Sequence, residues 1–346
     1  MSEDNFVPDE SNWIELPKEG RLNTEFIKDL IKEVSYTNEL FFRPTLRQIV
    51  EIGKIKENEK YKSNGFLEVK PERFITLCEK YFVPGIRKFK FDNSNGQITD
   101  IVFKKKSISA QLSKIVLASE IFENSLPIIE RIFTVPTPII YEHPDVDGKI
   151  LTFPKKGYDR RFNSWLPEDS PEIIDDKITM EMAKETIELI VNEFCFKNGE
   201  DKTNAIAAII TPFLKGLYPS FNCRMPLFVY MANRERAGKD YLAGITGLIY
   251  EGKSIEENPI NSEDGKGNSK SNEEELRKKI TSAILSGKKR FHSANNKGYI
   301  NNAVFEAVLT NKYYTDRILG SNKETTHDNE IEFSLSGNMG ISFTAD

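Results

Sequence analysis

Hydrophobic residues in the first third of the chain recur with the spacing of helices and of strands in turn. Three stretches show the helical spacing: residues 24–34, 71–81 and 108–116. Shorter runs typical of strands lie around them: residues 40–43, 49–52, 66–70, 86–91 and 99–103. The last two flank an Asn-Ser-Asn-Gly turn and predict a hairpin. Residues 1–134 are therefore predicted to form a mixed α/β module, and we find no catalytic pattern in it.

Two segments of different character follow this module. Prolines punctuate short strands in residues 135–177, which predicts a β-rich connector. Residues 178–224 then carry apolar residues at the spacing of two helices, about 179–194 and 202–217. Pro212 predicts a kink in the second helix. We interpret the pair as a helical collar, and we expect an apolar stripe that includes Met180 to lie in its core.

The pattern changes again at residue 225, where a short apolar run predicts a buried strand over residues 226–231. Loop residues 232–239 and a helix over residues 240–250 follow. Further elements are predicted downstream: a helix with a capping-box start at Asn272, a strand over 289–296, a helix capped by Asn302 and a strand over 331–338. Residues 225–346 are therefore predicted to be an α/β domain of the P-loop ATPase type.

A strand, a loop and a helix in this order are the setting that a phosphate-binding loop requires. Backbone N–H groups and the positive end of the helix hold phosphate oxygens there, and a lysine reaches the terminal phosphates. Lys239 is the candidate lysine, and Asp240 can hold Mg²⁺ directly or through water. The candidate nucleotide-binding residues are Asn233, Arg234, Glu235, Arg236, Ala237, Gly238, Lys239, Asp240 and Tyr241.

The loop departs from the phosphate-loop consensus. Asn233 stands at the first glycine position, where asparagine is the residue that best tolerates a positive φ after glycine. Asp240 replaces the hydroxyl residue that ordinarily ligates Mg²⁺, and it brings negative charge close to the phosphates. Residues 289–296 contain no acid, although an ATPase of this order places there the carboxylate that binds magnesium and polarises the attacking water. This last departure argues against fast hydrolysis.

Net charge, apolar runs and the spacing of cysteine and histidine limit the kinds of protein that this chain is expected to be. The 346 residues carry a net charge of −5, so a global basic field that coats nucleic acid is not expected. Two local basic clusters, residues 104–106 and 288–290, are interpreted as solvated faces or loops. No apolar run is long enough to predict a membrane span or a signal peptide. Three scattered cysteines and three scattered histidines predict no zinc site and a reduced cytoplasm, that of a bacterial host or a virus-infected cell.

The order of several segments resembles the helicase domain of phage and mobile-element replication proteins, which are AAA+ ATPases related to superfamily 3 and to primase-helicases. The recurring segments are Gly-Lys-Asp at 238–240, the helix over 276–287, the strand over 291–296, Thr-Asp-Arg-Ile-Leu-Gly at 315–320 and Ser-Gly-Asn at 336–338. The similarity extends upstream to Gly-Tyr-Asp at 157–159 and covers about residues 135–346. It implies an AAA+ fold with a helical collar.

The resemblance also implies an activity and partners. Proteins of this family form rings, usually hexamers, that use ATP and Mg²⁺ to act on single-stranded or forked DNA together with other replication proteins. By resemblance Lys239 maps to the Walker A lysine, Asp240 to the magnesium-proximal position and Asn338 to sensor 1. Residues 295–296 fall at the end of the Walker B strand. The family carries an arginine finger beyond the point where this chain ends, which implies a fragment or a further subunit, and Arg317 is the remaining candidate for a phosphate contact.

Two other functions stay open on the same residues. A nucleotide-gated DNA-binding or scaffold subunit without hydrolysis would account for the missing acid. A phage-type nucleoside monophosphate kinase also uses a Gly-Lys-Asp loop, but it needs an arginine-rich lid, and residues 251–272 contain no arginine. ATP hydrolysis with and without DNA separates these functions from the helicase-like one.

Overall fold

The chain divides into two compact units, one of residues 1–56 and 62–130 and one of residues 131–346. The computed structural model describes most of both units. The described residues are 13–17, 21–34, 37, 39–56, 62–91, 97–142, 148–173, 177–214, 217, 224–234, 236–254, 256–260, 269–286, 288–317, 324–338 and 340–343. No helix within these ranges is long and apolar enough to cross a membrane.

The first unit is a mixed α/β module, in agreement with the periodicity. One antiparallel sheet has the order β2-β3-β4, and a second sheet has the order β1-β5-β6. Helix α2 begins with Pro71 in its first turn, where the missing N–H costs nothing. The elements are β1 (Trp13–Glu15), α1 (Asn23–Val34), β2 (Phe41–Arg43), β3 (Gln48–Lys56), β4 (Lys62–Glu68), α2 (Pro71–Tyr81), β5 (Val83–Phe91), β6 (Ile98–Lys105), α3 (Ala110–Leu117) and α4 (Glu120–Glu123).

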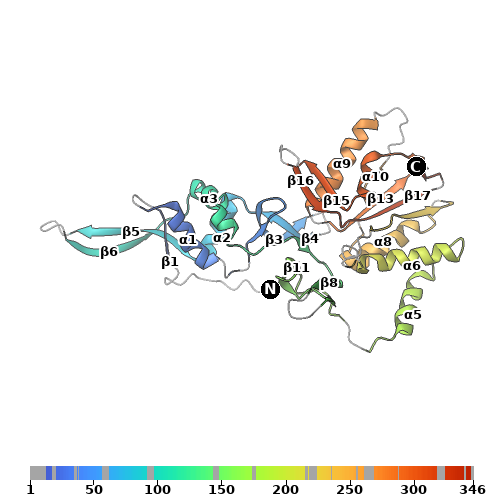
Figure 1. Ribbon diagram of the computed structural model, residues 1–346, viewed down its shortest axis with the longest axis horizontal. Coiled ribbons are helices and arrows are strands. Elements are labelled where there is room, and N and C mark those ends of the chain that lie inside the picture. Colours follow the sequence, from blue (N-terminus) through green and yellow to red (C-terminus); the bar gives the residue numbers. More distant parts are fainter. Residues whose placement is uncertain are drawn as a thin grey trace. The chain divides into compact units, whose positions relative to one another are not determined.

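The core of this unit is aromatic and aliphatic. Phe26, Leu30, Phe74 and Phe122 are fully buried, and the rings of Phe74 and Phe122 meet edge to face with centroids 5.7 Å apart. Helices α1 and α2 supply the first three of these side chains at the helical spacing that the sequence predicts. Beyond Ile86 the β5–β6 hairpin leaves this core and extends past the helices of the unit as a two-stranded ribbon (Figure 1).

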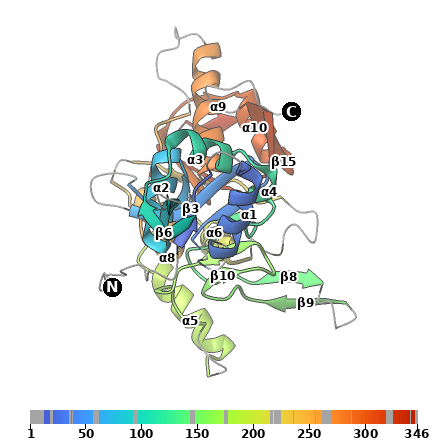
Figure 2. The same cartoon turned by 90° about the vertical axis from the view of Figure 1, so that its left-hand side faces the viewer.

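The second unit begins with short strands. Strand β11 (Ser164–Leu166) pairs in parallel with β7 (Arg131–Ile132) and antiparallel with β10 (Gly157–Asp159). Strands β8 (Ile139–Glu142) and β9 (Lys149–Thr152) pair antiparallel and form the ribbon labelled β8 and β9 in Figure 2. Asp159 is buried where β10 ends, and its carboxylate accepts hydrogen bonds from the backbone N–H groups of Lys155 and Arg161.

Two helices follow, α5 (Met180–Val191) and α6 (Gly199–Leu214). Thr179 caps α5 by accepting a hydrogen bond from the Met182 N–H, and Pro212 lies inside α6 near its end. The expectation that the apolar stripe of α5 forms a core is wrong for Met180, which is 67% exposed, whereas Val191 is buried. Helix α5 packs along α6, so only the side that faces α6 loses contact with water.

Three parallel strands form the central sheet of the second unit, in the order β12-β17-β13. Ala232 at the end of β12 lies opposite Asn338 at the end of β17, so the carboxyl ends of these strands share one edge. The elements are β12 (Phe228–Ala232), α8 (Lys239–Glu251), α9 (Ser269–Leu285), β13 (Arg290–Asn296), β14 (Tyr299–Ile300), α10 (Ala303–Thr310), β15 (Tyr313–Arg317), β16 (Glu324–Asp328), β17 (Glu332–Asn338) and β18 (Ser342–Phe343).

Helices cover this sheet on both faces (Figure 1). Helices α9 and α10 cover one face and build a hydrophobic core with Phe291, Phe333 and Leu335. Helix α8 contacts all three strands from the other face. A parallel sheet needs this double cover, because each connection between parallel strands must cross over a face of the sheet.

Some predictions for this region need correction. Helix α9 begins at Ser269, one turn before the capping box expected at Asn272. Strand β16 was not predicted, although it pairs with β15 along its whole length. Downstream of α8, where no strand was predicted, Glu257 forms a parallel bridge with Ser293 of β13. Tertiary pairing, which local spacing does not encode, decides the last two of these differences.

Candidate functional site

The loop between β12 and α8 leaves the carboxyl edge of the central sheet. Its left-handed residues are Arg236, with φ +58°, and Gly238, with φ +83°. The expectation that Asn233 would take the positive φ is therefore wrong, because the turn that lifts the chain toward α8 comes three residues later. Glu235 lies outside the described residues.

Gly238 is the N-cap of α8, and it explains why glycine stands before the lysine. Its left-handed backbone is disfavoured for residues with a Cβ by roughly 1 kcal/mol. Space is not the constraint, since a Cβ there would meet only the Phe194 ring, at 3.7 Å. The carbonyl of Gly238 accepts the Leu242 N–H at 3.0 Å, the first bond of the helix. The N–H groups of the first turn of α8 therefore point toward the edge of the sheet.

Lys239 and Asp240 open α8 and contact each other. The Lys239 side chain is 11% exposed, and its Nζ donates to Asp240 Oδ2 at 2.7 Å. Asp240 Oδ1 accepts a hydrogen bond of 2.8 Å from Ser336 Oγ of β17. Partial burial by itself would raise the pKa of the Asp240 carboxyl, but the hydrogen bonds from Lys239 and Ser336 outweigh it and lower the pKa. The Asp240 carboxylate is therefore ionised, and it lies beside the end of β17, the central strand.

Asn338 ends β17 beside the loop strand. Its Oδ1 atom is buried and accepts no hydrogen bond from any described residue. A buried amide oxygen without a donor is costly, so its position favours a role toward a ligand or bound water. The structure therefore places Lys239, Asp240 and Asn338 at the same edge of the sheet.

The end of β13 is built differently from the ends of its neighbours. The strand carries one extra residue relative to β17 between Ser293 and Asn296, and Asn295 absorbs it with φ +57°. Asn296 is buried, and its amide nitrogen donates to the carbonyls of Ser293 and Ser336 while its Oδ1 accepts the N–H of Ile260. These bonds occupy the side chain, so Asn296 fastens the strand end and offers nothing to a nucleotide.

A buried polar layer runs beneath α8, away from the loop. Ser334 Oγ lies 2.8 Å from His292 Nδ1, and Arg290 donates to the carbonyl of Ala243 in α8 at 2.7 Å. Burial, reinforced by the positive charge of Arg290, lowers the pKa of His292 to about 3. The imidazole is therefore neutral at physiological pH.

Sequence reasoning missed the two serines of this layer, Ser334 and Ser336. A signal was present: the run Glu-Phe-Ser-Leu-Ser alternates strictly over residues 332–336. Alternation of period two in a central parallel strand, where both faces are covered, indicates that the polar residues face something polar inside the protein.

The remaining candidate residues lie on the surface. Arg234, Arg236 and Ala237 are exposed in the loop, and Tyr241 is 81% exposed on α8. Arg317 is exposed at the end of β15, where it forms an ion pair across the hairpin with Glu324 at 3.6 Å. The ion pair turns Arg317 toward its own hairpin, and within the described part of the chain Arg317 makes no hydrogen bond or ion pair with the loop.

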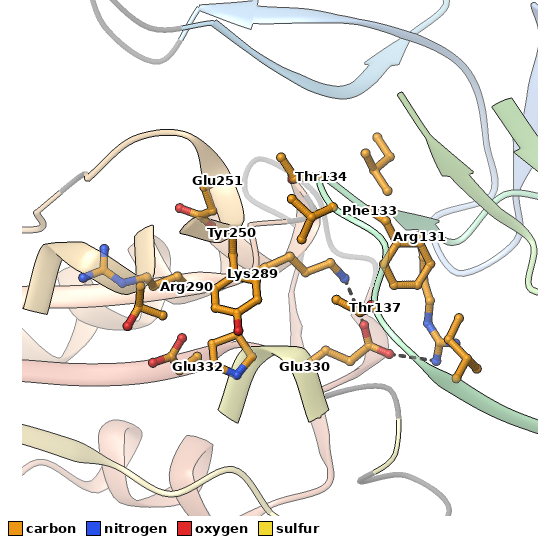
Figure 3. A pocket seen from close by; sticks show the side chains of 15 residues that line it. Arg131, Phe133, Thr134, Thr137, Tyr250, Glu251, Lys289, Arg290, Glu330 and Glu332 are labelled. Carbon is orange, nitrogen blue, oxygen red and sulfur yellow. Dashed lines mark hydrogen bonds and ion pairs between the residues drawn. The ribbon is translucent and has the colours of Figure 1, made fainter. Parts of the chain in front are cut away.

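A pocket lies at the opposite end of the central sheet (Figure 3). Lys289 and Arg131 converge on Glu330 there, with ion-pair distances of 2.9 Å and 2.7 Å. The pocket is lined by residues next to the amino ends of β13 and β17 and by Tyr250 at the end of α8. Ligands of parallel α/β sheets bind at the carboxyl ends of the strands, so this pocket is not the candidate nucleotide site.

Comparison with protein-family models and with curated proteins gives no match for this chain.

Proposed function

We propose that the chain binds a nucleoside triphosphate at the loop of residues 233–240 and uses it, as a helicase-like ATPase of the AAA+ type, to act on DNA in the replication of a phage or mobile element. One observation carries the nucleotide site: a loop that ends in left-handed Gly238, at the start of a helix, leaves the carboxyl edge of a parallel sheet beside Asn338. That edge is where α/β sheets bind phosphate groups.

The residues of the loop fit a triphosphate with one metal ion. The first turn of α8 supplies N–H donors and the positive end of the helix dipole. Lys239 must exchange its contact with Asp240 for a phosphate oxygen, which releases a carboxylate. Mg²⁺ is commonly bound by one or two carboxylates together with substrate phosphates, and Asp240 supplies one. Bound Mg²⁺ would offset phosphate charge, while Asn338 would orient the terminal phosphate or its water.

The AAA+ assignment and a homo-oligomeric, hexameric ring rest on the sequence resemblance, and the strand arrangement is consistent with the AAA+ assignment alone. The strands that the resemblance assigns to Walker A, Walker B and sensor 1 are neighbours in one parallel sheet. Exposed Tyr241 and Arg317 are accessible to a neighbouring subunit, and Arg317 is the candidate phosphate contact in trans.

A second function has an observation of its own in its favour. The end of β13 carries no carboxylate, and the amide of Asn296 is occupied by protein partners. Among the described residues, the end of β13 therefore offers no carboxylate that could polarise an attacking water. This supports a subunit in which bound ATP gates contact with DNA or with other replication proteins and is not hydrolysed.

Nucleotide binding is tested with fluorescent ATP and Mg²⁺ on the wild type and on Lys239→Ala. Removal of a charge-assisted contact is expected to weaken binding by roughly 10- to 100-fold. Lys184→Ala is the matched control, since Lys184 is an exposed lysine of α5 and should leave the affinity unchanged. Wild-type protein that fails to bind any nucleotide at millimolar concentration would contradict the proposal.

Phosphate release then separates the two functions. Release stimulated by single-stranded DNA and lost in Lys239→Ala supports the ATPase, whereas tight ATP binding with no release supports the gated subunit. Phosphate transfer to a nucleoside monophosphate without DNA would instead indicate the kinase.

A further inference from the structure

We infer that the distal β5–β6 ribbon, residues 87–91 and 98–104, is a binding surface for single-stranded DNA, with bases stacked on one face and phosphates held by lysines of the other. The inference extends the proposed function by naming the surface that meets DNA. The proposed function supplies only the identity of the partner, DNA. The observations that carry the inference come from the residues of the ribbon itself.

The ribbon has two chemically distinct faces, fixed by its register. Phe89 lies opposite Ile101, and Phe91 lies opposite Ile98, which places these four side chains on one face. All four are exposed, with fractions between 42% for Phe89 and 58% for Phe91. Exposed apolar side chains that gather on one face are typical of binding surfaces, and the planar rings of phenylalanine are what bases of single strands stack on.

Three lysines lie on the opposite face, together with Val102 and Asp100. Lys88 and Lys104 lie on it next to each other, because Lys88 pairs with Val102 and Ile86 pairs with Lys104. Both lysines are exposed. Lys90 shares this face and forms an ion pair of 3.0 Å with Asp100. The ribbon is only two strands wide. A long lysine side chain on one face can therefore reach around its edge to the phosphate backbone of a DNA strand whose bases stack on the other face.

Charge selects nucleic acid over a second copy of this chain. Residues 83–106 contain six basic and two acidic side chains, a net charge of +4, in a chain whose total is −5. Two such ribbons repel each other, whereas a phosphate backbone is attracted and releases counterions on binding. The basic cluster at residues 104–106 therefore continues a charged surface and is not an isolated solvated loop.

The base of the ribbon is anchored, which allows the distal part to be changed without loss of the fold. Strand β1 pairs with β5 at Val83–Gly85, and Trp13 packs edge-on against Phe103 with ring centroids 3.8 Å apart. Arg87 is tied to Glu15 at 3.4 Å. Phe89 and Phe91 lie beyond these contacts, where every described residue of β5 is exposed.

The test is the affinity of the full chain for a fluorescein-labelled oligothymidylate, measured by anisotropy without nucleotide. Phe89→Ala/Phe91→Ala is expected to raise Kd by roughly 10-fold or more, because stacking on an aromatic side chain is lost. Phe89→Leu/Phe91→Leu should not restore binding, whereas Phe89→Trp/Phe91→Trp should. Leu22→Ala, at an exposed leucine of the same unit, is the matched control and should bind as the wild type does.

The lysines are tested by salt dependence. Lys88→Ala/Lys104→Ala should lower the slope of log Kd against log salt by roughly 1.4, since each phosphate contact of a single strand contributes about 0.7. Lys28→Ala/Lys114→Ala, at exposed lysines of α1 and α3, should leave the slope unchanged. A duplex of the same length is expected to bind more weakly and without dependence on the phenylalanines.

Several outcomes would overturn the inference. The first is wild-type oligonucleotide affinity in Phe89→Ala/Phe91→Ala, and the second is wild-type affinity in Phe89→Leu/Phe91→Leu. The third is a change of the double alanine variant from dimer to monomer while its oligonucleotide affinity stays unchanged. Lys239→Ala keeps its oligonucleotide affinity if the ribbon acts alone. Failure of nucleotide binding therefore counts against the loop, and failure of the ribbon variants counts against the ribbon.

Discussion

The two faces of the central sheet differ in chemistry although the same strands build them. On β17, Phe333 and Leu335 pack against α9 and α10, whereas Ser334 and Ser336 face α8. Both faces are buried. A buried hydroxyl costs free energy unless it is hydrogen-bonded, and both serines are hydrogen-bonded, so the polar face is tolerated but adds less to stability than the apolar face. The difference indicates that stability is concentrated on the α9 face, whereas the α8 face borders the loop for which nucleotide binding is proposed.

The α8 face also connects the loop to the interior. Ser336 bonds to Asp240 beside the loop, and Ser334 bonds to His292 deeper in the layer. A change in the contacts of Asp240 would therefore act first on β17, the central strand. Substitutions on each face test this difference between the two faces of the sheet.

The largest effect is expected on the apolar face. Leu335→Ala removes a side chain that is fully buried, and it should lower the free energy of unfolding by about 3 kcal/mol. Urea unfolding followed by circular dichroism measures this. Leu189→Ala, at a leucine that is 73% exposed, should change stability by less than about 0.5 kcal/mol. A loss in Leu335→Ala as small as in the control would show that the α9 face is not the main core.

A smaller effect is expected from acid on the polar face. Native His292 stays neutral down to a pKa of about 3, whereas unfolded histidine protonates near its ordinary pKa of 6.5. The unfolded state therefore binds more protons between these values, and stability falls as pH is lowered through that window. From pH 6.5 to 5 the loss should be about 2 kcal/mol.

The lowered pKa of Asp240 acts in a different window, below the ordinary carboxyl pKa of 3.8. Urea unfolding between pH 6.5 and 5 therefore isolates the histidine. His292→Asn should flatten the dependence of stability on pH, whatever its absolute stability. An unchanged slope in this variant would assign the acid sensitivity to other groups.

The smallest effect is expected at the junction of the polar layer and the loop. Ser336→Ala removes the hydrogen bond to Asp240 Oδ1 and should cost about 1 kcal/mol of stability, because Asp240 is partly exposed and water replaces the bond. ATP affinity in the presence of Mg²⁺ should change by less than in Lys239→Ala. Ser334→Ala is the matched control, since Ser334 is one pair of residues deeper, and it should leave ATP affinity unchanged.

Much of the fold was predictable where local signals are strong. Helices α1, α2 and α8 and strands β12, β13 and β17 lie within a few residues of their predicted bounds. Their periodicity, caps and prolines act within one element, so a single sequence displays them. The cap at Asn302 is of this kind, and its side chain accepts the Phe305 N–H as expected.

The candidate site was predicted in part, for the same reason. The sequence alone determined that a glycine and a lysine stand between an apolar strand and a helix, that no acid ends β13, and that Asn338 ends a strand. Only the tertiary structure decided that β17 lies between β12 and β13, and that this order brings Ser336 to Asp240 and fills the amide of Asn296. Strand order and cross-strand contacts join residues about forty to a hundred positions apart, and spacing along the chain carries no record of such pairings.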